Sequence, residues 1–151
     1  HPVWNTATDF YFESVYENGL KLIISSNEEK GGVKFEGTEG WVWADRGRYG
    51  ASSENILKSE IKPDEIQLYK SENHFRNFID CVYSRKETIA PAEIAHRSIT
   101  IAHLGNIAMK LETDLEWDPK TEMILNNELA NNMLARPMRE PWASIYKEYA
   151  V

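Results

Sequence analysis

The chain has 151 residues, of which 42% are hydrophobic and 27% charged, proportions typical of one soluble globular domain. Seventeen basic against twenty-four acidic residues give a formal net charge of −7 with no basic stripe, which argues against nucleic acid as a partner. No apolar run approaches the ~20 residues of a membrane span, and the lone Cys81 excludes an internal disulfide while leaving the compartment open.

A β-hairpin is predicted over residues 6–26. Two runs rich in aromatic and β-branched residues flank Asn18-Gly19, which is the strongest short-range hairpin signal. Phe10 and Phe12 alternate with polar residues, so we expect one covered face and one wetter face.

A second hairpin is predicted over residues 33–47, after the charged loop NEEKGG of residues 27–32. Its turn should lie at residues 37–40. The large apolar side chains expected to face one another across this hairpin are Val33, Phe35, Trp41 and Trp43. Packing of the two tryptophans in a core or interface is favoured over a sugar-stacking platform.

Polar residues follow the second hairpin and lead into a weakly patterned region. Arg46 and Arg48 lie in a charged loop that can be a solvated turn or can grip a carboxylate or a hydroxylated ligand. A strand is expected at Ile66–Tyr69 after the Pro63-Asp64 turn.

Two helices are predicted next. Ser71 is a plausible N-cap for a helix over Ser71–Ser84, which carries Cys81 as a core residue. The longer helix spans Pro91–Leu111, with proline at its start, and its apolar residues cover most of its circumference. Such a helix is usually buried on more than one side.

The long helix also carries unusual polar residues. These are His96, Arg97, Ser98, His103 and Asn106. A polar group buried without a partner costs a few kcal/mol, so either the fold or a ligand must satisfy them. His96 and His103 are separated by ~10 Å along the helix, which is too far for a normal pair of zinc ligands. We expect one of these histidines in the core and the other in a cleft, where it can bond to a sugar hydroxyl.

The last third of the chain is predicted to hold a third hairpin around Asp118-Pro119 and a short helix over residues 127–134. Two prolines should keep residues 136–142 extended. Strands dominate the first half and helices the second. The class is therefore α+β, with a mainly antiparallel open sheet and helices packed on one face.

Several ordered motifs occur in the run from Arg85 to Trp142. They are A-P-A-E-I-A-H-R-S, H-L-G-N-I-A, W-D-P and R-P-M-R-E-P-W. Together they resemble the C-terminal part of the Gfo/Idh/MocA oxidoreductases, the family of glucose-fructose oxidoreductase and inositol dehydrogenase, and in particular a bacterial branch of it. The hairpin GVKFEGTEGWVWADRG is similar to that branch as well.

The resemblance implies that residues 1–151 form a single C-terminal substrate-binding and oligomerisation domain, a fragment of a longer enzyme of carbohydrate metabolism. NAD or NADP would bind to an N-terminal Rossmann domain that this chain lacks, so we expect no cofactor and no catalytic residue here. Oligomers would form through the open sheet. Some relatives use the cofactor for glycoside cleavage instead of net oxidation.

Five residues are the candidates to line a sugar-like substrate: His96, Arg97, Arg46, Arg48 and Tyr49. Two other functions are weighed against this one. A stand-alone carbohydrate-binding or scaffolding module is suggested by Trp41, Trp43, Trp117 and Trp142. An independent hydrolase built on His96 or His103 ranks third.

Overall fold

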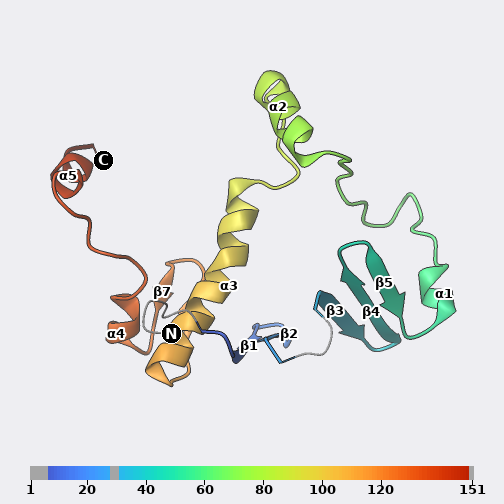
Figure 1. Ribbon diagram of the computed structural model, residues 1–151, viewed down its shortest axis with the longest axis horizontal. Coiled ribbons are helices and arrows are strands. Elements are labelled where there is room, and N and C mark those ends of the chain that lie inside the picture. The colour runs from blue at the N-terminus through green and yellow to red at the C-terminus, as the bar shows by residue number, and fades with distance from the viewer. Residues whose placement is uncertain (1–6, 28–30, 150–151) are drawn as a thin grey trace. The chain divides into compact units, whose positions relative to one another are not determined.

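The computed structural model describes residues 7–27 and 31–149 (Figure 1). Thr6, at the start of the first predicted hairpin, and residues 28–30 of the predicted charged loop lie outside the described residues. The chain divides into two compact units, one made of His1–Ser25 and Ala92–Val151 and the other of Ser26–Pro91.

The first unit begins with the predicted hairpin, which is confirmed. Strands β1 (Tyr11–Val15) and β2 (Lys21–Ser25) pair antiparallel, and the Gly19 N–H donates to the Tyr16 carbonyl at 2.8 Å. Gly19 adopts φ +83°, which glycine enters without steric cost. The paired residues Phe12 and Ile24 are half-buried on the face that meets helix α3.

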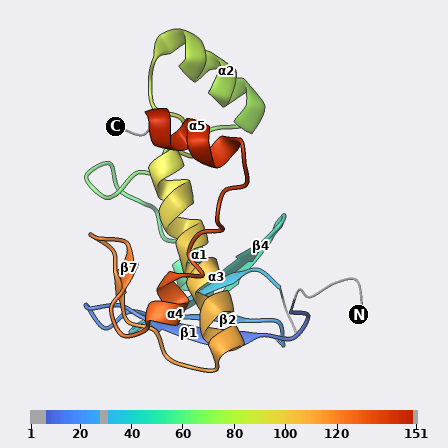
Figure 2. The ribbon, with the colours of Figure 1, turned by 90° about the vertical axis from the view of Figure 1, so that its left-hand side faces the viewer.

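Helix α3 (Ala92–Leu111) is the predicted long helix and starts directly after Pro91. Its C-terminal half packs against the hairpin, as Figure 2 shows, and Gly105 is buried at this contact. A Cβ at Gly105 would lie 2.6 Å from Cδ2 of Phe12, so this contact needs glycine. Ile94 and Ile99 in the N-terminal half are exposed. Among the described residues, burial of α3 on more than one side therefore applies only to its C-terminal half.

The core of the first unit lies on the other side of α3. Ile107 packs with Ile124 and Ala130, and the half-buried residues around them are Leu104, Leu111, Leu115 and Trp117. Ile124 belongs to the third hairpin, which is confirmed as β6 (Trp117–Asp118) and β7 (Met123–Ile124). Ala130 belongs to α4 (Glu128–Asn131), shorter than the predicted helix and capped by Asn127, whose side chain accepts from the Ala130 N–H.

The C-terminal tail differs from the predicted extended segment of residues 136–142. Residues 136–139 form no helix or strand, and residues 140–141 form a turn. Helix α5 (Trp142–Tyr149) follows, where the sequence pattern predicted no helix. Trp142 begins this helix directly after Pro141, a favourable residue at a helix start.

The second unit contains a three-stranded antiparallel sheet of β3 (Val33–Gly37), β4 (Gly40–Asp45) and β5 (Arg48–Ala51). The predicted hairpin is present, but the predicted side-chain pairing is wrong. Phe35 pairs with Val42, and Trp41 pairs with Glu36, because a two-residue turn joins Gly37 to Gly40. A shift of one residue moves every side chain to the opposite face of a strand.

The predicted charged loop after β4 is a tight turn that leads into β5. Arg46 and Gly47 form this turn between the paired residues Asp45 and Arg48, and Gly47 adopts φ +73°. Strand β5 was missed because its sequence, RYGA, holds one strong strand former beside a glycine.

Two helices complete the second unit. Helix α1 (Glu54–Leu57) was not predicted, and no strand forms at Ile66–Tyr69, so that prediction is wrong. Helix α2 (His74–Ser84) is capped by Asn73, which accepts from the Arg76 N–H at 2.9 Å, and not by Ser71. Cys81 is buried, as predicted.

The α+β class with antiparallel strands is confirmed, although the described strands form three small sheets and not one. In residues 7–27 and 31–149, no helix has the length and apolar character that crossing a membrane requires.

Candidate functional site

The first group of candidate residues lies in the N-terminal turns of α3. His96 Nε2 lies 2.8 Å from Oε1 of Glu122, a residue in the turn between β6 and β7. Glu122 adopts φ 54°, a left-handed conformation that residues other than glycine enter at a cost of ~1 kcal/mol or more. The turn thus holds a carboxylate against the helix.

Arg97 joins the same cluster. It donates from Nε to Glu93 at 2.8 Å, one helical turn earlier, and from Nη1 to the Pro119 carbonyl at 2.8 Å. Its Nη1 also lies 3.3 Å from Glu122 Oε1. Arg97 therefore ties α3 to the β6–β7 turn, and its guanidinium is largely committed to the fold.

The turn that carries Glu122 is stabilised by its own first residue. Asp118 accepts from the Thr121 hydroxyl at 2.6 Å and from the Lys120 N–H at 2.9 Å. These hydrogen bonds, the hydroxyl first, hold the pKa of Asp118 below its usual range. The carboxylate therefore stays charged in mild acid, and the turn keeps its shape.

The His96 cluster can orient a ligand-facing imidazole. A carboxylate on one ring nitrogen fixes the ring and its tautomer. Nδ1 of His96 has no protein partner among the described residues, and half of the side chain is exposed. The prediction that one histidine belongs to the core is wrong for His96, since it is hydrogen-bonded but not buried.

The second group of candidates lies at the β4–β5 turn of the other unit. Arg48 bonds to Asp45, and its guanidinium lies 5.6 Å from the ring centroid of Trp43. The Arg48 side chain and then the Arg46 N–H hold the pKa of Asp45 below its usual range. Tyr49 lies on the opposite face of the sheet from Arg48 and is 76% exposed.

The five predicted residues therefore form two groups, one in each unit. His96 and Arg97 meet at Glu122, whereas Arg46, Arg48 and Tyr49 share only a turn. Sequence reasoning missed the Glu93–Arg97 ion pair, although its four-residue spacing on a helix is a recognisable signal. Glu122 carried no such signal because its position depends on the third hairpin.

The tryptophans of the sheet make structural contacts. The Lys34 ammonium lies 5.3 Å from a ring centroid of Trp41. Trp43 donates from Nε1 to the Gly31 carbonyl at 3.0 Å and also contacts Arg48. A cation over each ring competes with a sugar for the same surface. These contacts favour packing over a sugar-stacking platform.

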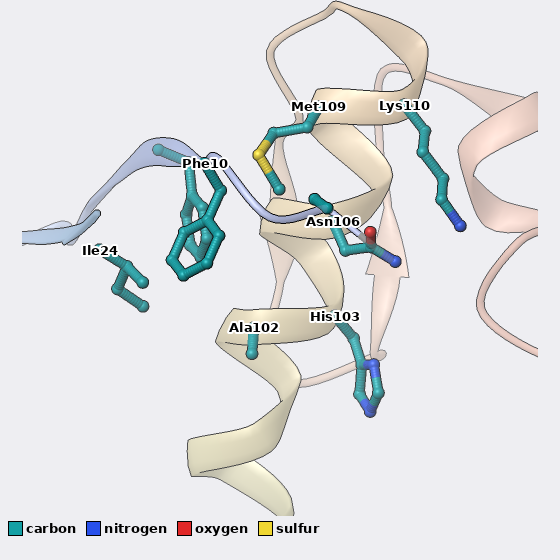
Figure 3. Close-up of a pocket in the computed structure, with 9 residues that line it drawn as sticks. Phe10, Ile24, Ala102, His103, Asn106, Met109 and Lys110 are labelled. Carbon is teal, nitrogen blue, oxygen red and sulfur yellow. The ribbon is translucent and has the colours of Figure 1, made fainter. Parts of the chain in front are cut away.

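A groove runs between the C-terminal half of α3 and the β1–β2 hairpin, within the first unit. It is open to solvent and has a volume of about 460 Å³. In Figure 3, Phe10 and Ile24 lie on one side of the helix and His103 and Lys110 on the other, with Asn106 between them. His103 is thus the cleft histidine that the sequence predicted, whereas Asn106 and Lys110 were not predicted as site residues.

The antiparallel sheets, the long helix and the His96 cluster define an α+β domain with a polar site on a helix. A comparison with protein-family models matches residues 6–144 to the model described as the oxidoreductase family, C-terminal alpha/beta domain, of the Gfo/Idh/MocA type. The chain belongs to the Gfo/Idh/MocA oxidoreductases and matches their C-terminal domain. Comparisons with curated proteins and with solved structures give no significant match.

Proposed function

We propose that this domain is the substrate-side and oligomerisation domain of an NAD(P)-dependent oxidoreductase that acts on a sugar, a polyol or a related compound. The family match over residues 6–144 is the observation that supports this function. In this proposal the whole chain acts as a single C-terminal domain, and an N-terminal Rossmann domain of the same protein binds the dinucleotide.

The residues of this chain do not fit a dinucleotide. A Rossmann phosphate cradle needs a glycine-rich turn between a strand and a helix in a parallel sheet. The strand pairs of the described residues are all antiparallel, and the sequence contains no G-x-G-x-x-G. The domain alone is therefore expected to be inactive in hydride transfer.

The substrate contacts that we propose for this domain centre on His96. Its ring is oriented by Glu122 and its side chain is half exposed. With Nε2 donating to Glu122, Nδ1 of the neutral imidazole can accept a hydrogen bond from a hydroxyl. Arg97 supports this arrangement by holding Glu122 and Glu93. We also propose that the substrate contacts Arg46, Arg48 and Tyr49.

Oligomerisation is proposed to use the apolar face of the β3–β4–β5 sheet. The exposed side chains on this face are Val33, Phe35, Val42 and Tyr49. Phe35 is 66% exposed, and a row of exposed apolar side chains on a sheet is typical of a surface covered by another subunit. The proposed occupant is a second copy of this chain, in an isologous contact.

Replacing Phe35 by glutamate tests this interface. A charge in the middle of an apolar contact should weaken self-association roughly tenfold or more. The readout is the mass in solution by light scattering across a dilution series. The control is Thr38→Glu, which adds the same charge at the exposed turn of the same hairpin. A monomeric unmodified chain, or Phe35→Glu with unchanged association, would contradict the proposed interface.

A further inference from the structure

The polar side chains of α3 differ in their hydrogen-bond partners. Ser98 and Thr100 donate to helix carbonyls, at Ile94 and His96 respectively, and His96 bonds to Glu122. His103 and Asn106, which lie further along the helix, have no side-chain hydrogen bond to any described residue. Both line the groove beside the β1–β2 hairpin.

Lys110 extends this row of polar side chains. It follows Asn106 by one helical turn, lines the same groove, and makes no ion pair within residues 7–27 and 31–149. His103, Asn106 and Lys110 are spaced at i, i+3 and i+7, so they share one side of the helix over ~10 Å. Three polar groups therefore follow the groove along its length.

The other residues that line the groove are mainly apolar. They include Phe10, Phe12 and Ile24 from the hairpin segment and Met109 from α3. Aromatic walls of this kind favour flat ligands with an apolar face, such as the C–H face of a sugar ring. The volume of about 460 Å³ lies within the ~300–1,000 Å³ usual for small-molecule sites.

Each polar group restricts the ligand. The Lys110 ammonium only donates and carries a positive charge, so it selects an anionic acceptor. Asn106 and neutral His103 both donate and accept, as a row of hydroxyl groups requires. We propose that the groove binds a sugar acid or a similar polyhydroxylated carboxylate, with its carboxylate on Lys110, its hydroxyls on Asn106 and His103, and its ring against Phe10 and Phe12.

This inference rests on the proposed function only for the sugar-like nature of the ligand; it adds the site and the negative charge. The site is separate from the His96 cluster and needs no dinucleotide. Binding to the chain alone therefore tests it without reference to NADH or to the oligomeric state.

The experiment titrates D-glucuronate into the 151-residue chain and follows the backbone amide shifts of residues 103–110 by NMR. D-glucuronamide, which has the same shape and no charge, is the matched ligand. We expect saturable shifts with glucuronate and binding roughly tenfold weaker or more with the amide, since a charge-assisted hydrogen bond is lost.

Lys110→Met removes the ammonium and keeps most of the stem. It should weaken glucuronate binding roughly tenfold or more, whereas Lys120→Met, the same change in an exposed turn of the same unit, should not. Unchanged far-UV circular dichroism of both variants establishes that they are folded. Equal affinity for acid and amide, no shift at residues 103–110, or unchanged affinity of Lys110→Met would each overturn the proposal. If the chain forms oligomers and does not bind NADH, but also does not bind glucuronate, only the groove proposal is wrong and the proposed function stands.

Discussion

Replacing Gly105 by alanine is expected to destabilise the first unit, although alanine is the better helix former. The new Cβ would lie 2.6 Å from Cδ2 of Phe12 and closer still to Cε2 and Cζ. Overpacking of this kind costs about 1–3 kcal/mol. Alanine gains about 1 kcal/mol over glycine in a helix interior, so the steric cost should exceed or at least cancel the gain.

The measurement is the free energy of unfolding by urea denaturation. Gly31→Ala is the control, because the same change there places a Cβ in open space. A second variant that combines Gly105→Ala with Phe12→Leu should recover part of the lost stability, since the smaller side chain gives way. A Gly105→Ala chain that is clearly more stable than the original would show that Phe12 does not rest on Gly105.

Replacing Asn131 by alanine is expected to destabilise the first unit strongly. The Asn131 amide accepts from the Ile124 N–H at 2.8 Å and donates to the Ile124 carbonyl. Ile124 is only 2% exposed, so both backbone groups would lose their partners away from water. Each unsatisfied group costs about 1–3 kcal/mol, which gives a loss of about 2–6 kcal/mol for the two groups.

Asn132→Ala is the matched control for this prediction. Asn132 is the next residue, it is exposed, and its side chain has no hydrogen bond within the described part of the chain. Its replacement should change the free energy of unfolding by less than about 0.5 kcal/mol. Equal losses from the two variants would show that Asn131 does not hold β7.

Local signals in the sequence predicted the elements that depend on near neighbours. Asn18-Gly19 indicated the first hairpin because few residues other than Asn and Gly tolerate such a turn. Pro91 marked the start of α3 within one residue. The motifs between Arg85 and Trp142 indicated the correct family, because each motif is a short run of residues that needs no knowledge of distant contacts.

Features that depend on long-range geometry could not be predicted in the same way. The turn at Gly37–Gly40 shifts the pairing of β4 by one residue, and the sequence pattern fits either register. The contact between His96 and Glu122 joins residues 26 positions apart in the chain. It exists only because the β6–β7 turn places a left-handed residue beside α3.

The groove beside α3 could not be predicted from the sequence either. His103 and Asn106 were recognisable as polar residues on an apolar helix, but the hairpin segment that supplies Phe10 is nearly a hundred residues away in the sequence. Lys110 looked like an ordinary basic residue in the last turn of a helix, where it is favoured by the helix dipole. Only its place among the residues that line the groove suggests a binding role.

The most direct test of the proposed function is the mass of the chain in solution by light scattering, with NADH titrated into the same sample. A substrate-side and oligomerisation domain should form a dimer or a larger species and show no binding of NADH. A monomer that binds NADH would contradict the proposal that a separate Rossmann domain binds the cofactor, because the cofactor site would then lie within this domain.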